Sequence, residues 1–584
     1  MRSIKILAAI LIITAPLLLH SKEKDVEIQM QVMIPMRDGV ELSADIYMPA
    51  ERSGPVHALF ILTPYGGNRV HDDAMRFAAE GYAVLGVDCR GRGNSGGEFI
   101  PFVNEGKDGY DVCKWISEQP WSSGKIGMFG GSYLGMVQWL VLKENPPWLL
   151  SVIPTATVAP GIDFPKFNNI YYTYNTQWLA FVMGNTLNRS MFIDHNYWNS
   201  VFREYLTSFV SYYTLDKLSG FESDVFQAWI EHPFFDDYYK SILPSKEDYE
   251  EIQIPLLTIT GHFDDDQPGT MYYYLNYQKY ASKGAKDMCY MIIGPWNHGG
   301  TRHPAKNMGD LEFDDNSLID MNKLYLEWFD WTLRNGKRPD FLQDHVAVYE
   351  MGSDKWKYAD SLDDLNNEFE EFYLSSQIMP ANDVFNSGLL IGAPYESEEA
   401  DIYVYDPLDT SMVEQKLQDN LIDFSWREEA EAHYPGRLIY HTEPLEKELN
   451  IAGFVRFEAY LEMDVRDTDI EAILYEITPD GKCIYLTSAI MRARHRNTIE
   501  KEELIEPGEI TFFDIDTFHY FAREISKDSR LRLVFGALNS PYYQKNYNSG
   551  RSVTSENYND AVTATVKLYH DERYPSKLLL PVME

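Results

Sequence analysis

A serine in a glycine-rich segment is the side chain of this sequence best placed to act as a nucleophile. Ser132 follows an apolar run, Lys125–Phe129, and the two glycines Gly130 and Gly131, and a helical pattern comes after it. A nucleophilic serine on a sharp turn from strand to helix needs such small neighbours, because the turn is strained and crowded. The helix N-terminus would also stabilise an oxyanion formed during acyl transfer. The segment therefore predicts a serine nucleophile. The alternative is an incidental serine in a glycine-rich turn, because Leu134 stands where the usual motif has its second glycine.

Acidic side chains and a histidine follow two later apolar runs. Asp264, Asp265 and Asp266 come after one of them, and His298 comes after the next. The chain order serine, acid, histidine, with each residue just beyond a strand, is that of α/β serine hydrolases. In such a triad the histidine transfers the proton and the acid holds its tautomer, and spacing alone does not choose among the three aspartates. Competing histidines are His232, His262 and His303.

A second glycine-rich segment offers a different chemistry. Gly91–Gly96 matches the G-x-G-x-x-G pattern of dinucleotide-binding turns and follows the apolar run Ala83–Asp88. A turn of that kind opens directly into a helix, whereas residues 97–101 are Gly-Glu-Phe-Ile-Pro, which is typical of a loop. We therefore expect a structural loop beside Ser132, and neither a nucleotide site nor another cofactor.

The elements that must position these residues are alternating strands and helices. Apolar runs bounded by turn residues predict strands buried on both faces, and helical stretches separate them. The first half of the chain is therefore expected to form an α/β domain with a doubly wound sheet, preceded by antiparallel strands at Val26–Pro49. The buried strands are expected at His57–Leu62, Tyr82–Val87, Lys125–Phe129, Leu149–Pro154, Pro255–Thr260 and Met288–Ile293, with helices that include Asp72–Ala79 and Gly106–Glu118.

Two changes in residue composition and hydrophobic pattern divide the chain further. Between about Ala159 and Ser245 it is aromatic-rich and helical in pattern, which predicts a cap inserted into the α/β domain. From about His345 onward short alternating strands, such as His345–Tyr349, predict an all-β sandwich. The expected divisions are a signal peptide at 1–21, an α/β core at 22–158 and 246–340, a helical cap at 159–245, and a β-sandwich at 345–584.

The N-terminus and the charge balance indicate where the protein works. Arg2 and Lys5 precede an apolar run, Ile6–Leu19, which is short for a membrane span and typical of a cleaved secretory signal ending near Ser21. We expect a secreted or periplasmic protein without stable membrane insertion after cleavage, with an uncleaved anchor helix as the alternative. The net charge of −38 argues against a nucleic-acid partner.

The cysteines carry no recognisable motif. Cys89, Cys113, Cys289 and Cys483 are scattered and lack CxxC spacing, so the sequence predicts no zinc or other metal site. A protein of this size does not need disulfides to hold its core. We expect buried free thiols.

Several motifs together carry a family resemblance. They are Gly-x-Ser-Tyr-x-Gly at 130–135, Gly-x-aromatic-Asp at 261–264, Gly-Pro-Trp-x-His at 294–298, Asp-Cys-Arg-Gly-Arg-Gly-Asn-Ser at 88–95, Thr-Pro-Tyr-Gly at 63–66, His-Pro at 232–233 and Tyr-Asp-Pro at 405–407. With them the sequence resembles the family of cocaine esterase, α-amino-acid ester hydrolases, glutaryl-cephalosporin acylases and X-Pro dipeptidyl peptidases. The resemblance covers nearly the whole mature chain, and the family motif carries its second glycine one position late. It implies an α/β-hydrolase core, an inserted helical cap and a C-terminal jelly-roll sandwich.

The resemblance also implies roles for particular residues. It selects Asp264 as the acid of the triad, and it implies an oxyanion hole made of the Tyr65 hydroxyl and the backbone N–H of Tyr133. Two branches of the family recognise a substrate ammonium, which requires carboxylates near the acyl pocket. The candidates here are Asp265, Asp266, Asp236 and Asp237, with ordinary solvated acids as the alternative.

The expected function is that of a secreted serine hydrolase. It would cleave a small-molecule ester or amide through a covalent acyl-enzyme, with Ser132, Asp264 and His298 as its triad. One alternative is an exopeptidase of the X-Pro dipeptidyl-peptidase type, although the typical members carry a longer N-terminal region. Another is a carbohydrate-binding protein with a decayed hydrolase core, which the complete triad pattern disfavours. The natural substrate and whether the protein forms a homo-oligomer stay open at this point.

Overall fold

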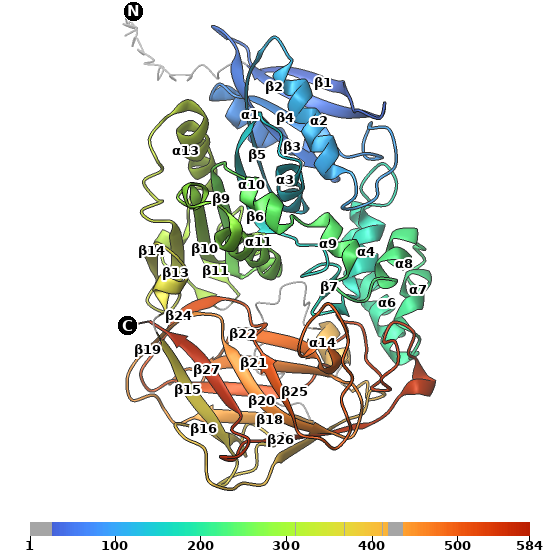
Figure 1. Ribbon diagram of the computed structural model, residues 1–584, viewed down its shortest axis with the longest axis vertical. Helices are drawn as coiled ribbons and strands as arrows, with labels where there is room; N and C mark the ends of the chain where they lie inside the picture. Colours follow the sequence, from blue (N-terminus) through green and yellow to red (C-terminus); the bar gives the residue numbers. More distant parts are fainter. Residues whose placement is uncertain (1–25, 310, 367, 412, 419–435, 584) are drawn as a thin grey trace, which may run out of the picture.

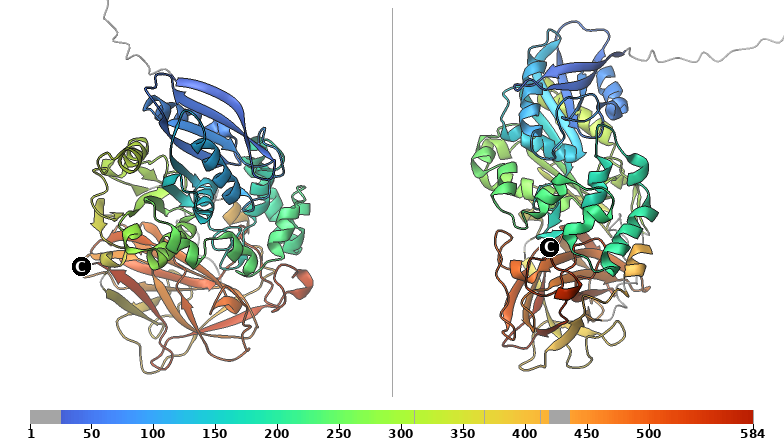
Figure 2. Two further views of the ribbon diagram at one scale, coloured as in Figure 1. Left: turned by 45° about the horizontal axis from the view of Figure 1, so that its top comes forward. Right: turned by 90° about the vertical axis from the view of Figure 1, so that its right-hand side faces the viewer.

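The computed structural model describes residues 26–309, 311–366, 368–411, 413–418 and 436–583, so the expected signal peptide at 1–21 lies outside the described residues. The described chain forms an α/β part, a helical insertion and an all-β part, which pack against one another (Figures 1 and 2). Each of its helices is too short or too polar to cross a lipid bilayer.

A ten-stranded sheet forms the centre of the α/β part, in the order β1-β2-β4-β3-β5-β6-β9-β10-β13-β14. The strands from β4 to β13 pair in parallel, while β1, β2 and β14 add antiparallel pairs at the two edges. The central strands are buried along nearly their whole length, which explains their continuous apolar sequence. The strands are β1 (Val26–Pro35), β2 (Glu41–Pro49), β3 (Val56–Thr63), β4 (Ala83–Asp88), β5 (Ser122–Ser132), β6 (Leu149–Thr157), β9 (Leu256–Phe263), β10 (Cys289–Asn297), β13 (Val346–Glu350) and β14 (Lys355–Ala359).

Helices cover both faces of this sheet, as the alternation of elements predicts. One face packs against side chains such as Val112 and Met136, and the other against Phe77 and Trp328. On the first face lie α2 (Glu105–Ser117), α3 (Tyr133–Lys143) and α11 (Gln267–Tyr280), and on the second lie α1 (His71–Ala79) and α13 (Met321–Arg334). The arrangement is the doubly wound sheet of an α/β hydrolase.

The insertion between β6 and β9 is helical, and large aromatic side chains such as Trp198 and Trp229 fill its interior. It includes α10, which lies just beyond the expected cap range of 159–245, and most of its helices lie on the right-hand side of the molecule in Figure 1. Its elements are β7 (Lys166–Phe167), β8 (Ile170–Tyr171), α4 (Tyr174–Phe181), α5 (Arg189–Phe192), α6 (His195–Thr207), α7 (Leu215–Leu218), α8 (Asp224–Ile230), α9 (Asp237–Ile242) and α10 (Lys246–Glu251).

The all-β part forms the lower half of Figure 1 and has its own apolar core, which includes Phe457 and Leu533. Buried and partly exposed positions alternate along β20, as the sequence pattern of this half predicts. The strands are β15 (Glu368–Ser375), β16 (Gly388–Ile391), β17 (Asp401–Tyr405), β18 (Arg437–Thr442), β19 (Leu449–Gly453), β20 (Arg456–Met463), β21 (Asp469–Ile477), β22 (Cys483–Arg492), β23 (Thr511–Ile515), β24 (Phe521–Ile525), β25 (Arg530–Ala537), β26 (Ala564–Tyr569) and β27 (Lys577–Val582), with the short helix α14 (Val413–Gln418) beside them.

One strand lies in a different sheet from the one expected. The segment His345–Tyr349 was expected to begin the sandwich, but β13 pairs in parallel with β10 and therefore extends the α/β sheet. All five residues of β13 are buried, and β14 pairs with it at the sheet edge. A five-residue apolar strand carries no periodicity that tells one sheet from another.

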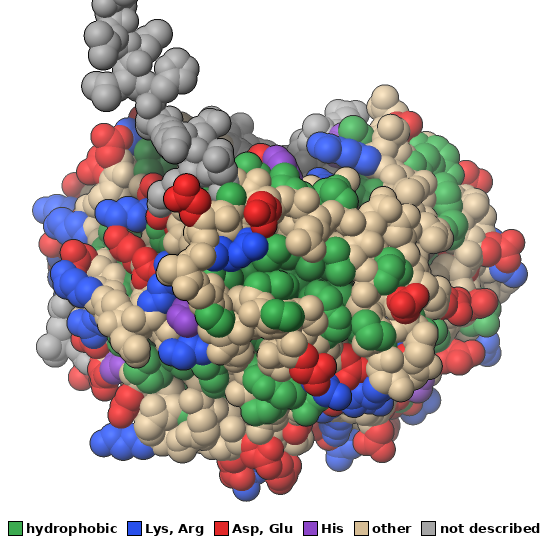
Figure 3. Space-filling view, turned by 90° about the horizontal axis from the view of Figure 1, so that it is seen from above, with side chains coloured by type: hydrophobic (Ala, Val, Ile, Leu, Met, Phe, Trp, Pro, Cys, Tyr) green, Lys and Arg blue, Asp and Glu red, His purple; other side chains and the backbone are tan. Residues whose placement is uncertain are grey.

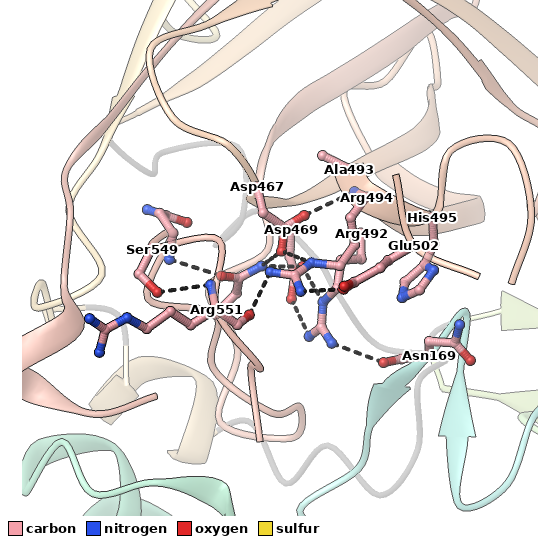
Figure 4. Close-up of polar contacts among 12 residues, drawn as sticks. Asn169, Asp467, Asp469, Arg492, Ala493, Arg494, His495, Glu502, Ser549 and Arg551 are labelled. Carbon is pink, nitrogen blue, oxygen red and sulfur yellow. Dashed lines mark hydrogen bonds and ion pairs between the residues drawn. The ribbon is translucent and has the colours of Figure 1, made fainter. Parts of the chain in front are cut away.

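A buried network of charged side chains joins the all-β part to the insertion (Figure 4). Arg492 forms a two-pronged ion pair with Asp469, at 2.8 and 2.9 Å, and donates a hydrogen bond of 3.0 Å to the backbone oxygen of Asn169, between β7 and β8. Arg494 pairs in turn with Asp467 at 2.8 Å. The four charged side chains are at most 5% exposed, so their charges depend on one another for compensation, and Arg494 is also paired with Glu502 at 2.8 Å.

The molecular surface mixes charges of both signs. Seen from above, acidic and basic side chains are interspersed around apolar side chains near the middle of the face (Figure 3). The net charge of −38 therefore does not gather into one acidic patch on this face.

The four cysteines are free thiols. Cys89, Cys113 and Cys289 are buried in the core of the α/β part, as expected. Cys483 differs, because it begins β22 and is only partly buried.

Candidate active site

The turn from β5 into α3 holds Ser132 in a strained backbone conformation. Ser132 has φ of 63° and ψ of −128°, which residues with a side chain rarely adopt. At Gly130, where φ is 138°, a β-carbon would lie 2.7 Å from the side chain of Leu134. At Gly135 a β-carbon would come within 2.9 Å of the Thr155 backbone oxygen. The late glycine of the motif is therefore explained by the close packing of α3 against β6.

His298 and Asp264 meet at the ends of the neighbouring parallel strands β10 and β9. The His298 Nδ1 atom lies 2.9 Å from Oδ1 of Asp264, whose side chain is fully buried and also accepts a 2.8 Å hydrogen bond from the Thr260 hydroxyl. Burial opposes ionisation of Asp264, but the hydrogen bonds from His298 and Thr260 outweigh it and lower the pKa of this carboxyl. An ionised acid at Nδ1 favours the tautomer that leaves Nε2 available to accept a proton.

Ser132 and His298 both line one cavity of about 700 Å³, a size typical of small-molecule sites. The hydroxyl of Ser132 makes a long hydrogen bond of 3.4 Å to Oδ2 of Asp266. The all-β part contributes Tyr542 to the wall. The insertion contributes the aromatic side chains Tyr172, Tyr174, Trp178, Phe181, Phe192, Trp198 and Phe202.

Tyr65 and Tyr133 lie beside this cavity at the C-terminal edge of the sheet. Tyr65 comes two residues after β3, and its oxygen accepts a 3.1 Å hydrogen bond from the indole N–H of Trp178, so its own O–H is free to donate. Burial raises the pKa of Tyr65 to about 12, which keeps this proton in place at neutral pH. The backbone N–H of Tyr133 begins α3 and has no acceptor within the helix, while its side-chain hydroxyl is occupied by Glu105.

The four candidate carboxylates for an ammonium separate into two pairs. Asp265 and Asp266 line the cavity, and each lies 3.6 Å from Nδ1 of His298. Asp236 and Asp237 are not among the described residues that line it, which corrects the expectation for this pair. Asp236 instead accepts the backbone N–H of Tyr238 at the start of α9, at 3.1 Å, and pairs with His232 at 2.8 Å. Asp237 lies in the first turn of the same helix. Both positions are explained by helix capping.

His262 and the second glycine-rich segment have structural roles, whereas His303 lines the cavity, as His298 does. His262 is buried, and its Nε2 atom lies 2.7 Å from the backbone oxygen of Tyr349. Gly91–Gly96 forms a loop, as predicted, and does not open a helix. Within it, Arg92 is buried and donates to the backbone oxygens of Pro64 at 2.8 Å and Val182 at 2.6 Å. The loop thereby links the segment that carries Tyr65 to the end of α4.

Among the cavity residues that the sequence did not single out are Asp163, Trp178 and Arg302. Asp163 accepts backbone N–H groups of Ala159 and Gly269, each at 2.7 Å, and burial raises its pKa well above the usual value. No motif marks these positions, because they reach the cavity only through the path of the chain between distant elements. An aromatic-rich cap was the one sequence signal that pointed towards Trp178.

Two groups of side chains place donor atoms within 4.8 Å of one another in the described part of the chain. In one of them the histidine nitrogen already takes part in the hydrogen bond to Asp264, and the other lies at the partly exposed edge of the sheet. We infer no metal site from either group. They are Asp264, Asp265 and His298, and Asp344, His345 and Asp360.

Known proteins resemble this chain over nearly its whole length. The profile of the X-Pro dipeptidyl-peptidase (S15 family) matches residues 38–300, and that of the X-Pro dipeptidyl-peptidase C-terminal non-catalytic domain matches residues 342–579. Cocaine esterase from Rhodococcus sp. (strain MB1 Bresler) is 27% identical over 95% of this chain and 98% of the esterase.

Two solved structures have the same fold. An α-amino acid ester hydrolase superposes with a TM-score of 0.81 at 20% identity, covering 98% of this chain and 99% of that protein. An aminopeptidase from a marine sediment archaeon, Thaumarchaeota archaeon, has a TM-score of 0.81 at 19% identity, covering 96% and 97%. The expected α/β-hydrolase core followed by an all-β domain is thereby confirmed. The chain belongs to the X-Pro dipeptidyl-peptidase (S15) family of serine hydrolases, and cocaine esterase is its relative over nearly the whole chain.

Proposed function

We propose that this protein is a secreted serine hydrolase that cleaves an ester or amide of a small acyl substrate through a covalent acyl-enzyme. Ser132 is the nucleophile, His298 the general base and Asp264 the acid that orients it. The observation that carries the proposal is the shared cavity. It contains a serine on a strained elbow and a histidine whose Nδ1 atom is held at 2.9 Å by a buried carboxylate.

The reaction follows from these contacts. The Ser132 hydroxyl leaves its long contact with Asp266, gives its proton to Nε2 of His298 and attacks the carbonyl carbon. The Tyr65 hydroxyl and the Tyr133 backbone N–H donate to the oxyanion of the tetrahedral intermediate. His298 then protonates the leaving group, and a water activated by the same histidine hydrolyses the acyl-enzyme.

A second candidate is an exopeptidase that releases short N-terminal units. Asp265 and Asp266 support it, because they line the cavity next to the catalytic serine and would attract a substrate ammonium.

The secretory route is supported by the charged and apolar N-terminal sequence from Arg2 to Leu19. N-terminal sequencing of the exported protein tests it, since a mature chain that begins near Ser21 is expected.

Labelling with a fluorophosphonate tests the nucleophile, because the reagent reacts with activated serines. The wild-type protein is expected to become labelled, and Ser132→Ala is expected to lose both label and turnover while it keeps its thermal unfolding temperature. Hydrolysis of p-nitrophenyl butyrate, phenylglycine methyl ester and Gly-Pro-p-nitroanilide, measured side by side, separates esterase from peptidase activity. Esterase activity in a folded Ser132→Ala protein would contradict the assignment.

A further inference from the structure

Arg302 is a cation in the wall of the cavity that forms no ion pair with a described side chain. It follows His298 by four residues, in a turn held by hydrogen bonds from Thr301 to Asn297 and from Arg302 to Gly299. Among the described residues it forms no ion pair, and its Nη1 atom is buried without a hydrogen-bond partner. A guanidinium nitrogen in that position lacks the hydrogen bonds that water would give it, which is unfavourable by itself.

The guanidinium lies directly beside the nucleophile. A β-carbon at Gly131, the residue before Ser132, would stand 2.2 Å from Nη1 and 2.9 Å from Cδ of Arg302. The absence of a side chain at Gly131 therefore makes the room that Arg302 occupies. The cation also acts on Tyr65 and Asp266, because it opposes the larger effect of burial on the pKa of both groups.

The carboxylates of the same cavity are engaged elsewhere. Both oxygens of Asp163 accept backbone N–H groups, and Asp266 accepts from the Ser132 hydroxyl. Asp265 lies 3.6 Å from the His298 ring. Asp73, which also lines the cavity, pairs with Arg76 at 3.1 Å. None of these carboxylates forms an ion pair with Arg302, which leaves its guanidinium available to an anionic group of a substrate.

We propose that Arg302 recognises a carboxylate of the substrate, so that the enzyme prefers small esters or amides that carry a free carboxylate near the scissile carbonyl. Arginine suits this partner, since its planar group of donors matches the two oxygens of a carboxylate. The cavity then has a cationic wall next to Gly131 and an acidic wall at the end of β9, with Ser132 between them. The inference rests on the proposed hydrolase function and adds the class of substrate to it.

Matched pairs of substrates test this preference. In one pair the acyl group carries the charge, as in mono(4-nitrophenyl) adipate against 4-nitrophenyl pentanoate. In the other pair the leaving group carries it, as in 4-acetoxybenzoate against phenyl acetate. The wild-type enzyme is expected to favour the anionic member of at least one pair. Arg302→Gln is expected to lower the ratio of kcat/KM, anionic over neutral, by about 10- to 100-fold, the range for hydrogen bonds to charged groups.

Two further variants separate a direct contact from a change in net charge. Arg302→Lys keeps the charge without the planar group and is expected to retain part of the preference. Arg69→Gln removes a cation from the exposed rim of the same cavity, so its effect on the ratio is expected to stay within about fivefold. An Arg69→Gln effect as large as that of Arg302→Gln would assign the preference to the general field and overturn the proposal.

Binding gives a readout that does not depend on turnover. Calorimetric titration of the Ser132→Ala protein with the preferred anionic ester is expected to show weaker binding, by a similar factor, when Arg302→Gln is added. Equal affinities of the Ser132→Ala protein with and without Arg302→Gln would overturn the role of Arg302. A wild-type enzyme that prefers the anionic substrate in neither pair would also overturn it. Failure of the proposed function looks different, because Ser132 would then escape the fluorophosphonate and neutral esters would also stay intact.

Discussion

The indole N–H of Trp178 donates a 3.1 Å hydrogen bond to the hydroxyl oxygen of Tyr65. Trp178 belongs to α4 of the insertion, whereas Tyr65 follows β3 of the α/β sheet. The insertion therefore orients the hydroxyl that we assign to the oxyanion hole, in addition to enclosing the substrate. A donor that is held in place before the reaction stabilises the oxyanion without reorganisation.

Tyr65→Phe keeps the ring and removes only the donor. We expect kcat to fall by roughly 10²–10³ while KM changes little, because the oxyanion exists only along the reaction path. Steady-state kinetics with p-nitrophenyl butyrate measure both values. Tyr174→Phe, at another partly buried tyrosine of the cavity, serves as the matched control and is expected to lose much less kcat. A Tyr65→Phe enzyme with nearly normal kcat would leave the second donor of the hole unidentified.

Trp178→Phe removes the hydrogen bond that orients Tyr65. We expect a smaller loss of kcat than in Tyr65→Phe, because the hydroxyl is still present but less well directed. In the double variant the two losses are expected not to add, since without the hydroxyl there is nothing left to orient. Additive losses in this double-mutant cycle would show that Trp178 acts by another route.

Asp264→Asn and Asp265→Asn distinguish the orienting acid from its neighbour. Asp264 is buried and bonded to His298 and Thr260, whereas the side chain of Asp265 is 43% exposed. An asparagine at 264 favours the wrong histidine tautomer, so we expect kcat to fall by about 10⁴, as in a related triad. Asp265→Asn is expected to lose far less. Similar losses in the two variants would contradict the assignment of Asp264.

Glu105 makes the stability of the fold depend on pH. Burial raises the pKa of this carboxyl from 4.5 to about 7, and its hydrogen bond with the Tyr133 side chain opposes that rise. The folded protein therefore binds the proton more tightly than the unfolded chain. The stabilisation is complete below pH 4.5 and is lost as the pH rises to 7.

Glu105→Gln removes this titration. Between pH 4.5 and pH 8 the free energy of unfolding of the wild type should fall by roughly 3 kcal/mol relative to that of the variant. Urea unfolding at a series of pH values measures the difference. Glu118→Gln, at the exposed C-terminal end of α2, is the control. Its free energy of unfolding should depend on pH as that of the wild type does. Parallel curves for wild type and Glu105→Gln would show that Glu105 keeps an ordinary pKa.

Gly135→Ala tests the packing that displaces the second glycine of the serine motif. The added carbon would come within 2.9 Å of the Thr155 backbone oxygen, and strand β6 has little freedom to move. We expect a loss of about 1–3 kcal/mol in the free energy of unfolding. Gly284→Ala, in α12 (Lys283–Lys286), meets no atom within 4 Å and should be neutral or slightly stabilising. Equal unfolding temperatures for the two variants would refute the packing explanation.

The sequence was informative wherever local pattern and function coincide. The strands before Ser132, Asp264 and His298 could be predicted, because buried parallel strands are continuously apolar and the chemistry lies at their ends. The sheet to which β13 belongs could not be predicted, because a short buried strand pairs by tertiary packing. Arg302 was missed for a similar reason. The position of Arg302 against Gly131 depends on how two loops about 170 residues apart in the chain come together. The spacing of neighbouring residues in the sequence does not predict such a contact.

The ion pair between Arg492 and Asp469 lies within the all-β part, and Arg492 also donates from it to the backbone oxygen of Asn169 in the insertion, which restricts how this sequence can change over time. Losing one member leaves the other charge buried alone, at a penalty of about 3–5 kcal/mol, whereas exchanging both members for apolar residues of similar volume is close to neutral. Substitutions at these positions should therefore be tolerated in pairs and rejected singly. Relatives that lack Arg492 are expected to lack Asp469 as well, so these two positions of the all-β part are expected to show correlated replacements.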